Sequence, residues 1–227
     1  MREHTAGMRP PRFLWVPFEL GRPFGAPDAP EFQMRVLRAV LDLFGRAGPP
    51  PVLEDFPDNP PDAAAIDMTG WTCPIPLPRL REDGTPELLA SVLAEIAGLA
   101  PWHRVALETR RRTATGVLGR PLEEVVRFLH ALSEGLPESP KAELTLGEAF
   151  RQAGEEVKTF YMEAATAKPG PRATSRALAD WFWGETAAGR MLLTLQPVWA
   201  ASANKGVRWV AASQLVPRVQ RHRLHPG

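Results

Sequence analysis

The residues best suited to bind a ligand lie in a turn between a short apolar segment and an amphipathic one. Glu19, Gly21, Arg22 and Gly25 directly follow the apolar residues 13–18. Backbone amides at a helix start attract anions, glycines allow close approach, and an arginine can hold a carboxylate or phosphate through two parallel hydrogen bonds. The turn therefore predicts a binding site for a small anionic ligand. The alternative is that Arg22 pairs with Glu19 and the glycines only shape the turn.

This turn matches neither of the common phosphate-binding motifs. The glycine spacing of a dinucleotide fingerprint and that of a P-loop are both absent. The tetrapeptide at residues 20–23, Leu-Gly-Arg-Pro, also recurs at residues 118–121, where a proline starts a helix. The Leu-Gly-Arg-Pro sequence at the first turn is therefore partly explained by how this chain forms turns, and not by ligand binding alone.

Glu185 is the candidate for acid or base catalysis. It lies one helical turn after Trp181 and one turn before Gly189, on an apolar face. Burial there would remove water from the carboxylate and raise its pKa, as a general acid or base requires. The alternative, which we favour, is a buried ion pair with Arg190 or with an arginine of another helix.

Cys73 is the only cysteine, so the chain forms no internal disulfide. As a catalytic residue Cys73 could form a mixed disulfide, but no second thiol follows it, and a small buried hydrophobic role is the favoured interpretation. The histidines show no spacing typical of metal ligands, so we predict no metal site and assign no cofactor.

The elements that would position these residues indicate a predominantly helical α/β protein. A strand over residues 12–18, a helix begun by Asp28 or Pro30, and a strand over residues 52–56 make a βαβ unit. That helix places six apolar residues at helical spacing: Phe32, Val36, Leu37, Val40, Leu41 and Phe44. We expect the βαβ unit to pack against a bundle of about five helices.

The expected organisation has five parts. They are a flexible tail at 1–11, the βαβ unit at 12–57, a proline-rich connection or lid at 58–85, a helical region at 86–216, and a basic tail at 217–227. Trp71, in the proline-rich part, could cover the ligand bound at the first turn.

Within the helical region, two helix starts have clear signals. Thr145 followed by Glu148 predicts a capping box. Thr174 or Ser175 is expected to begin a helix that continues to Leu195. Residues 101–112 fit either a helix or an exposed edge strand.

Composition limits the possible partners and compartments. A formal charge of +1 gives no reason to expect nucleic acid as a partner. The longest lipid-like run, residues 191–204, is too short for a membrane helix, and the N-terminus lacks the apolar core of a signal peptide. We therefore expect a cytoplasmic protein without a membrane partner.

Three stretches carry a resemblance to a known family. The runs VPFELGRPFGAP, FQMRVLRAVLDLF and PVLEDFP resemble the opening of bacterial proteins related to the selenoprotein B family of glycine, sarcosine, betaine and D-proline reductases. A weaker likeness lies at residues 180–186. The resemblance implies reductive chemistry at selenocysteine or a cysteine cluster, and this chain has neither. An enzyme of this kind would need another subunit's thiol or a bound cofactor.

Two function classes follow from these observations. The first is binding of a small anionic ligand at the first strand–helix turn, in a protein that the resemblance relates to the reductases. The second is a non-catalytic partner subunit, or a homo-oligomer, that uses its tryptophan-rich helical half as an interaction surface. Trp181 and Trp183 are two residues apart, so we expect one of them to be exposed or to contact a partner. Nothing in the sequence specifies a reaction.

Overall fold

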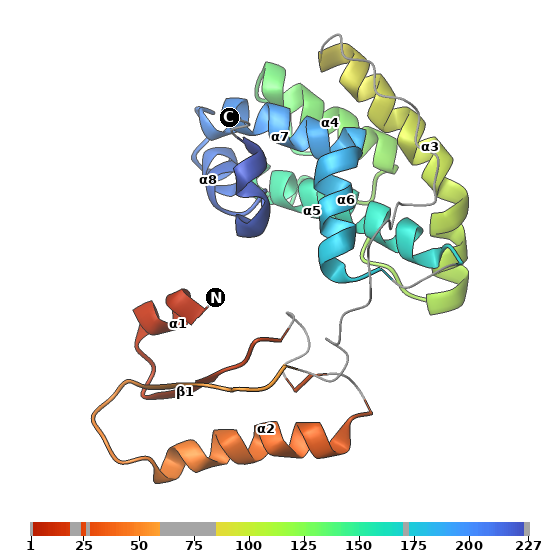
Figure 1. Ribbon diagram of the computed structural model, residues 1–227. Coiled ribbons are helices and arrows are strands. Elements are labelled where there is room, and N and C mark those ends of the chain that lie inside the picture. The colour runs from red at the N-terminus through yellow and green to blue at the C-terminus, as the bar shows by residue number, and fades with distance from the viewer. Residues whose placement is uncertain (1, 19–23, 26–27, 60–84, 170–172, 225–227) are drawn as a thin grey trace. The chain divides into compact units, whose positions relative to one another are not determined.

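The chain forms two compact units, residues Met1–Met68 and Thr69–Gly227, each described by itself. The computed structural model describes residues 2–18, 24–25, 28–59, 85–169 and 173–224 (Figure 1). The fold is mostly helical with one small parallel sheet, as the sequence predicts.

The N-terminal unit is built around a parallel strand pair. It contains helix α1 (Arg2–Met8), strand β1 (Arg12–Trp15), helix α2 (Pro30–Asp42), the 3-10 turn η1 (Leu43–Gly45) and strand β2 (Val52–Asp55). β1 and β2 pair in parallel from Arg12 opposite Val52 to Trp15 opposite Asp55. Because α2 connects two parallel strands, the predicted βαβ unit is confirmed.

A small aromatic core holds this unit together. Phe32 and Val36 of α2 are buried with Phe56, which follows β2. The rings of Phe18, Phe32 and Phe56 lie 5.5 to 5.9 Å apart, in tilted or edge-to-face arrangements. This cluster lies at the carboxyl end of the strand pair.

The N-terminal unit differs from expectation at two helix starts. Residues 2–8, expected in a flexible tail, form α1, and the Arg2 guanidinium contacts the Asp55 carboxylate at 2.7 Å. The residue before α2 is Ala29, not Asp28, and Asp28 has a φ of 59°. Pro30 in the first turn starts the helix without a side-chain cap.

The apolar residues of α2 divide between two faces. Phe32 and Val36 face the strands and are buried. Leu37, Val40, Leu41 and Phe44, expected on the same inward face, are exposed. With only two strands beneath it, the helix has just one apolar surface to cover, so the second set is left uncovered within this unit.

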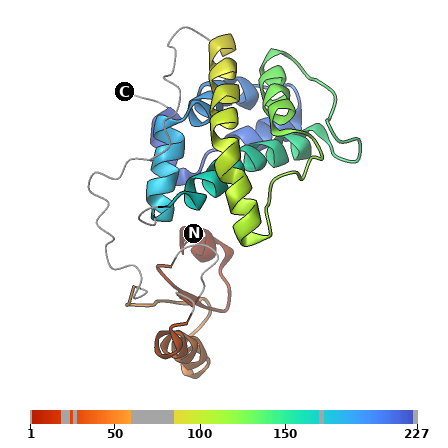
Figure 2. The same ribbon diagram turned by 90° about the vertical axis from the view of Figure 1, so that its right-hand side faces the viewer.

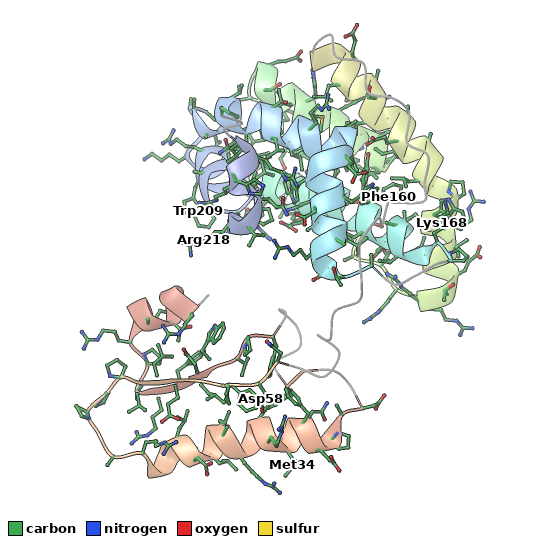
Figure 3. All side chains as sticks on the ribbon, viewed as in Figure 1. Met34, Asp58, Phe160, Lys168, Trp209 and Arg218 are labelled. Carbon is green, nitrogen blue, oxygen red and sulfur yellow. The ribbon has the colours of Figure 1, made fainter. Side chains whose placement is uncertain are left out.

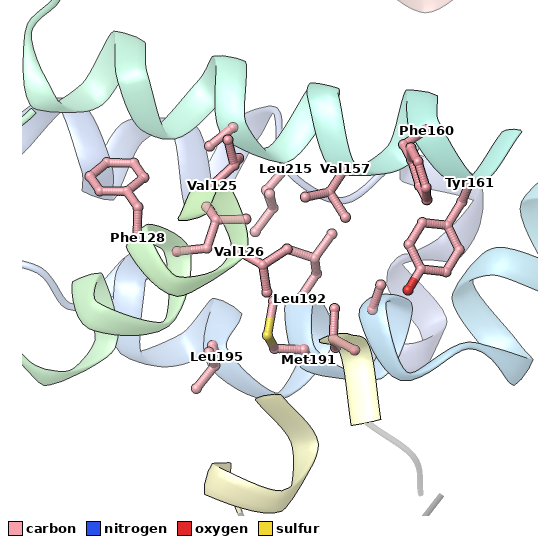
Figure 4. Close-up of a cluster of buried hydrophobic side chains, with 14 of the residues drawn as sticks. Val125, Val126, Phe128, Val157, Phe160, Tyr161, Met191, Leu192, Leu195 and Leu215 are labelled. Atoms are coloured by element: carbon pink, nitrogen blue, oxygen red, sulfur yellow. The ribbon is translucent and has the colours of Figure 1, made fainter. Parts of the chain in front are cut away.

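The C-terminal unit is a helical bundle arranged around α5. Its elements are α3 (Thr85–Arg110), α4 (Leu122–Glu134), α5 (Leu146–Ala167), α6 (Ser175–Glu185), α7 (Ala187–Ala200), α8 (Lys205–Ser213) and the 3-10 segment η3 (Arg218–Leu224). α5 packs against α3, α4, α6 and α8 (Figure 1, Figure 2). Val126, Val157 and Leu192 meet between α4, α5 and α7 in the core (Figure 4).

Local capping signals give the helix starts that the sequence predicts. Thr145 and Glu148 form the complete capping box of α5, and Thr174 accepts from the Ala177 amide at the start of α6. The ambiguous residues from 101 to 110 belong to α3, which continues through Pro101. They are helical, which excludes the edge-strand alternative.

The helix expected from Thr174 to Leu195 is in fact two helices. α6 ends at Glu185, and Thr186 caps α7 by accepting from the Gly189 amide at 2.9 Å. A Cβ at Gly189 would clash with the Phe182 carbonyl, so a glycine is needed where α7 turns past α6. Thr186 therefore divides the expected single helix in two, although the apolar spacing of the sequence continues across it.

The tryptophans are also distributed differently from expectation. Trp181 and Trp183 are both buried, because α6 packs against α5, α7 and η3 rather than against one neighbour. Among the tryptophans that the structure describes, the exposed one is Trp209 on α8. In the expected basic tail, residues 218–224 form η3 and bury Gln220.

Candidate functional sites

The predicted anion-binding turn is only partly covered by the described residues. Glu19, Gly21 and Arg22 lie outside them, as do Trp71 and Cys73. Gly25 is described and buried, with a φ of 84°. This backbone conformation strongly favours glycine, which gives a structural reason for Gly25 in the turn.

A charged pair lies at the carboxyl end of the two strands. Arg35, one turn into α2, contacts the Asp58 carboxylate at 3.1 Å, and its guanidinium lies 5.2 Å from the centre of the Phe32 ring. Figure 3 labels Asp58 on this unit. The carboxyl edge of the strands thus carries a described cation, Arg35, which is already paired with Asp58.

Glu185 is exposed, so both interpretations that bury its carboxylate are wrong: the desolvated acid or base, and the favoured buried ion pair with an arginine. The reason is the helix break: Glu185 is the last residue of α6, not the middle of a continuous apolar face. The buried carboxylate beside this junction is Glu95 of α3, which sequence reasoning missed. No local signal identifies it, because its partners are 66 to 93 positions away.

Glu95 binds the first amides of α7 and the hydroxyl of α5's tyrosine. The amides of Ala187 and Ala188 donate to its two carboxylate oxygens at 2.8 and 3.3 Å, and the Tyr161 hydroxyl donates at 2.7 Å. Burial raises the pKa of Glu95 above its ordinary 4.5, against the lowering effect of these hydrogen bonds and of the more distant Arg190. Burial and the neighbouring carboxylate raise the pKa of Tyr161 well above 10.0.

This cluster is suited to holding helices together rather than to acid–base chemistry. Every oxygen of Glu95 already accepts a hydrogen bond from the chain itself. A carboxylate at a helix N-terminus also interacts favourably with the helix dipole. Glu95 therefore ties α3, α5 and α7 to one another.

Two further carboxylates on one face of α5 hold the loop after α3. Glu156 is buried and accepts from the Gly116 amide at 2.5 Å and the Leu118 amide at 3.3 Å. Glu163, two turns later, accepts from the Ala114 amide at 3.2 Å and the Thr113 hydroxyl at 2.7 Å. The loop is therefore attached to the bundle by its backbone.

His103 is the second residue that sequence reasoning passed over. Its Nε2 lies 3.0 Å from Glu163 Oε2, and its ring lies 4.6 Å from the centre of the Phe160 ring. Thr115 Oγ1 is 3.5 Å from the same nitrogen. Because Glu163 also binds the loop, this arrangement resembles a structural tether more than a nucleophile with its base.

Neither a metal-binding cluster nor a membrane-spanning helix is found in the described part of the chain. Among the described residues, no three histidine, cysteine or acidic side chains come together as a metal site. Over the same residues, no helix is both long and apolar enough to span a membrane. Comparison with protein-family models, curated proteins and solved structures finds no significant match to this chain.

Proposed function

We propose that this chain is an interaction protein that pairs with a second copy of itself through α2. The observation that carries the proposal is a stripe of four large apolar side chains that the N-terminal unit leaves exposed, three on α2 and one on η1: Met34, Leu37, Leu41 and Phe44. Leu41 is 61% exposed and Phe44 is 76% exposed. Figure 3 labels Met34 on the side of α2 away from the strands.

The spacing of this stripe is that of a helix-pairing seam. Its members follow one another at intervals of three, four and three residues, as a and d positions do in a heptad. Phe32, Val36 and Leu43 occupy the opposite, buried side of the same segment. Full burial of one such side chain contributes about 1.5 to 3 kcal/mol, so covering the stripe is a substantial driving force.

A second copy in antiparallel orientation fits this stripe. Such pairing sets Met34 of one copy opposite Phe44 of the other and sets Leu37 opposite Leu41, so the interface is self-complementary. One flank of the stripe carries Arg38 and, one turn later, Asp42. With the second helix reversed, Arg38 is offset by two positions both from Asp42 and from Arg38 of the second copy, so one attraction and one repulsion act along that flank.

Sedimentation analysis of the purified chain tests this proposal. We expect dimers at about 10 to 100 μM and monomers for Leu41→Glu, because an acidic side chain cannot be buried unpaired in the seam. The matched control is Leu136→Glu, which changes an exposed leucine of the other unit and should leave the dimer intact. If the wild-type chain stays monomeric over this whole concentration range, pairing with a second copy is wrong. This holds even if a different protein covers the stripe.

A charge exchange tests the orientation of the two helices. Arg38→Asp or Asp42→Arg alone should weaken the dimer, and the two together should restore it. If the double variant is weaker than both single variants, the antiparallel arrangement is wrong.

A second candidate function is binding of a small carboxylate or phosphate at the turn between β1 and α2. It is supported by the parallel strand pair, since α/β proteins place ligands beyond the carboxyl ends of parallel strands, and by the left-handed conformation of Gly25. In this candidate, Glu19, Gly21, Arg22 and Gly25 form the site and Arg22 holds the anion.

Calorimetric titration with inorganic phosphate and with small carboxylates tests this candidate. Arg22→Ala should abolish binding without changing the melting temperature of the free protein. Arg104→Ala, which changes an exposed arginine of α3 in the other unit, is the matched control and should bind normally. Absence of binding by any of these anions to the wild-type chain would remove this function.

A further inference from the structure

The C-terminal end of the chain is strongly basic although the whole protein is almost neutral. No aspartate or glutamate follows Glu185, whereas six lysines and arginines do: Arg190, Lys205, Arg208, Arg218, Arg221 and Arg223. The formal charge of the full chain is only +1, so the remainder of the protein is acidic. Charge of one sign concentrated in one region creates a local field that the net charge conceals.

α8 presents part of this charge together with an aromatic ring. Val207, Val210 and Ala211 face the core and are buried. The opposite side carries Arg208 and Trp209, and the Trp209 side chain is 59% exposed. Figure 3 labels Trp209 and Arg218 at the α8 end of the helical unit.

Arginines lie at both ends of α8. Arg208 Nη1 donates to the Ser202 carbonyl at 2.6 Å, ahead of the helix. Arg221 Nη2 donates to the carbonyls of Ala212 and Ser213 at 3.1 and 3.3 Å, at the end of the helix. Both guanidiniums are positioned by neutral main-chain oxygens, so these contacts leave their charge uncompensated.

The carboxylates on the neighbouring helices are engaged elsewhere. Glu148 of α5 completes the capping box with Thr145. Glu155 of α5 binds Lys158 at 2.6 Å. Asp180 of α6 accepts from Gln220 at 2.7 Å and lies 3.8 Å from Arg223. None of these three described carboxylates forms an ion pair with Lys205, Arg208 or Arg221, so the outer side of α8 is a cationic surface with an exposed indole.

We propose that this surface, Lys205, Arg208, Trp209 and Arg221, binds single-stranded nucleic acid. The guanidiniums would contact successive phosphates, and an unpaired base would stack on the Trp209 ring. The near-neutral net charge gave no reason to expect nucleic acid, because it averages this region with the acidic remainder. Duplexes bind less well in this arrangement, since their bases are already stacked.

An anionic membrane fits the surface less well. Membrane-surface helices insert an apolar face, and the apolar face of α8 is buried in the protein core. Trp209 and Val219 are the large apolar side chains exposed on α8 and η3 among the described residues. Two separate side chains provide little area for insertion.

Fluorescence anisotropy with labelled single strands of about 15 nucleotides, deoxythymidine or uridine, tests the proposal at about 50 mM salt. Trp209→Ala should weaken binding about fivefold to 150-fold, the range that stacking of one base covers. Since each phosphate contact contributes about −0.7 to the slope of log affinity against log salt, Arg208→Gln with Arg221→Gln should make that slope shallower by about 1.4.

Controls separate this surface from general positive charge. Arg104→Gln with Arg127→Gln removes two exposed arginines from α3 and α4 and should leave binding unchanged. Arg221 also contacts the end of α8, so a second charge variant leaves Arg221 in place. This variant, Lys205→Gln with Arg208→Gln, should be folded by circular dichroism and should also weaken binding.

Three results would overturn the proposal. The first is no binding by the folded wild-type chain up to about 100 μM, the weak limit of non-specific binding. The second is binding that Trp209→Ala leaves unchanged. The third is binding to phosphatidylserine vesicles but not to single strands.

Discussion

The Tyr161 hydroxyl donates to Glu95 Oε2 over 2.7 Å and joins α5 to α3 across 66 positions of sequence. The same carboxylate accepts the first amides of α7, at Ala187 and Ala188. Three helices thus meet at one buried side chain. The carboxyl group of Glu95 is an internal structural element of the C-terminal unit.

Replacing Glu95 with leucine should destabilise this unit strongly. The substitution keeps a side chain of similar size but leaves the Tyr161 hydroxyl and two amides without an acceptor, and each buried orphan group costs about 1 to 3 kcal/mol. We expect a loss of about 3 kcal/mol or more in urea unfolding followed by far-ultraviolet circular dichroism. Tyr161→Phe should cost about 1 kcal/mol, since only one hydrogen bond is lost.

Glu123→Gln is the control for the Glu95 variants, because Glu123 is an exposed residue of α4. It should leave the free energy of unfolding within about 0.5 kcal/mol of wild type. A Glu95→Leu protein as stable as this control would mean that the three donors find other acceptors.

The stability of the chain should depend on pH through Glu95. Burial raises the pKa of Glu95 above 4.5, so between the unfolded and folded pKa values the folded chain binds more protons than the unfolded chain. This contribution is fully present below the unfolded pKa and is lost as pH rises through the folded pKa. Glu95→Gln should remove that decline from a series of urea titrations, and an unchanged pH profile in the variant would contradict this assignment.

Close packing between α5 and α8 should make Gly147 intolerant of any side chain. A Cβ at Gly147 would lie 2.7 Å from Gly206 Cα and 2.8 Å from its carbonyl carbon. Because both are backbone atoms, Gly147→Ala must push the helices apart, at a cost of about 1 to 3 kcal/mol in thermal or urea unfolding.

Gly98→Ala provides the matched control for Gly147→Ala. Gly98 lies in α3, and no atom is within 4 Å of its added Cβ. Alanine should stabilise this helix by about 0.5 to 1 kcal/mol. Equal effects of the two substitutions would contradict the close crossing of α5 and α8.

Removing the charge of Glu156 should loosen the loop after α3. The carboxylate holds the amides of Gly116 and Leu118, and glutamine offers only one acceptor oxygen for them. Hydrogen exchange measured by mass spectrometry should be about tenfold faster or more at residues 113–118 in Glu156→Gln, since losing about 1.4 kcal/mol of protection accelerates exchange tenfold. Exchange in α4 should not change, and uniform acceleration throughout the unit would indicate global destabilisation instead.

Local signals in the sequence determined much of this fold. The capping box at Thr145, the cap at Thr174 and the proline at position 30 each give a helix start by contacts within a few residues. The short strands separated by an amphipathic helix likewise indicated the parallel pair. At the candidate turn, Gly25 adopts the left-handed conformation that suits its glycine.

Only the tertiary structure decided which side chains are buried and which charges meet. Periodicity placed Leu41 with Val36 and suggested a buried Glu185, but the two-stranded sheet covers just one side of α2, and Thr186 ends the apolar face at Glu185. Glu95 with Tyr161, and His103 with Glu163, are brought together by helix packing over 60 or more positions. The physical reason is that backbone preferences act within a turn or two, whereas burial depends on what the rest of the chain places opposite each face.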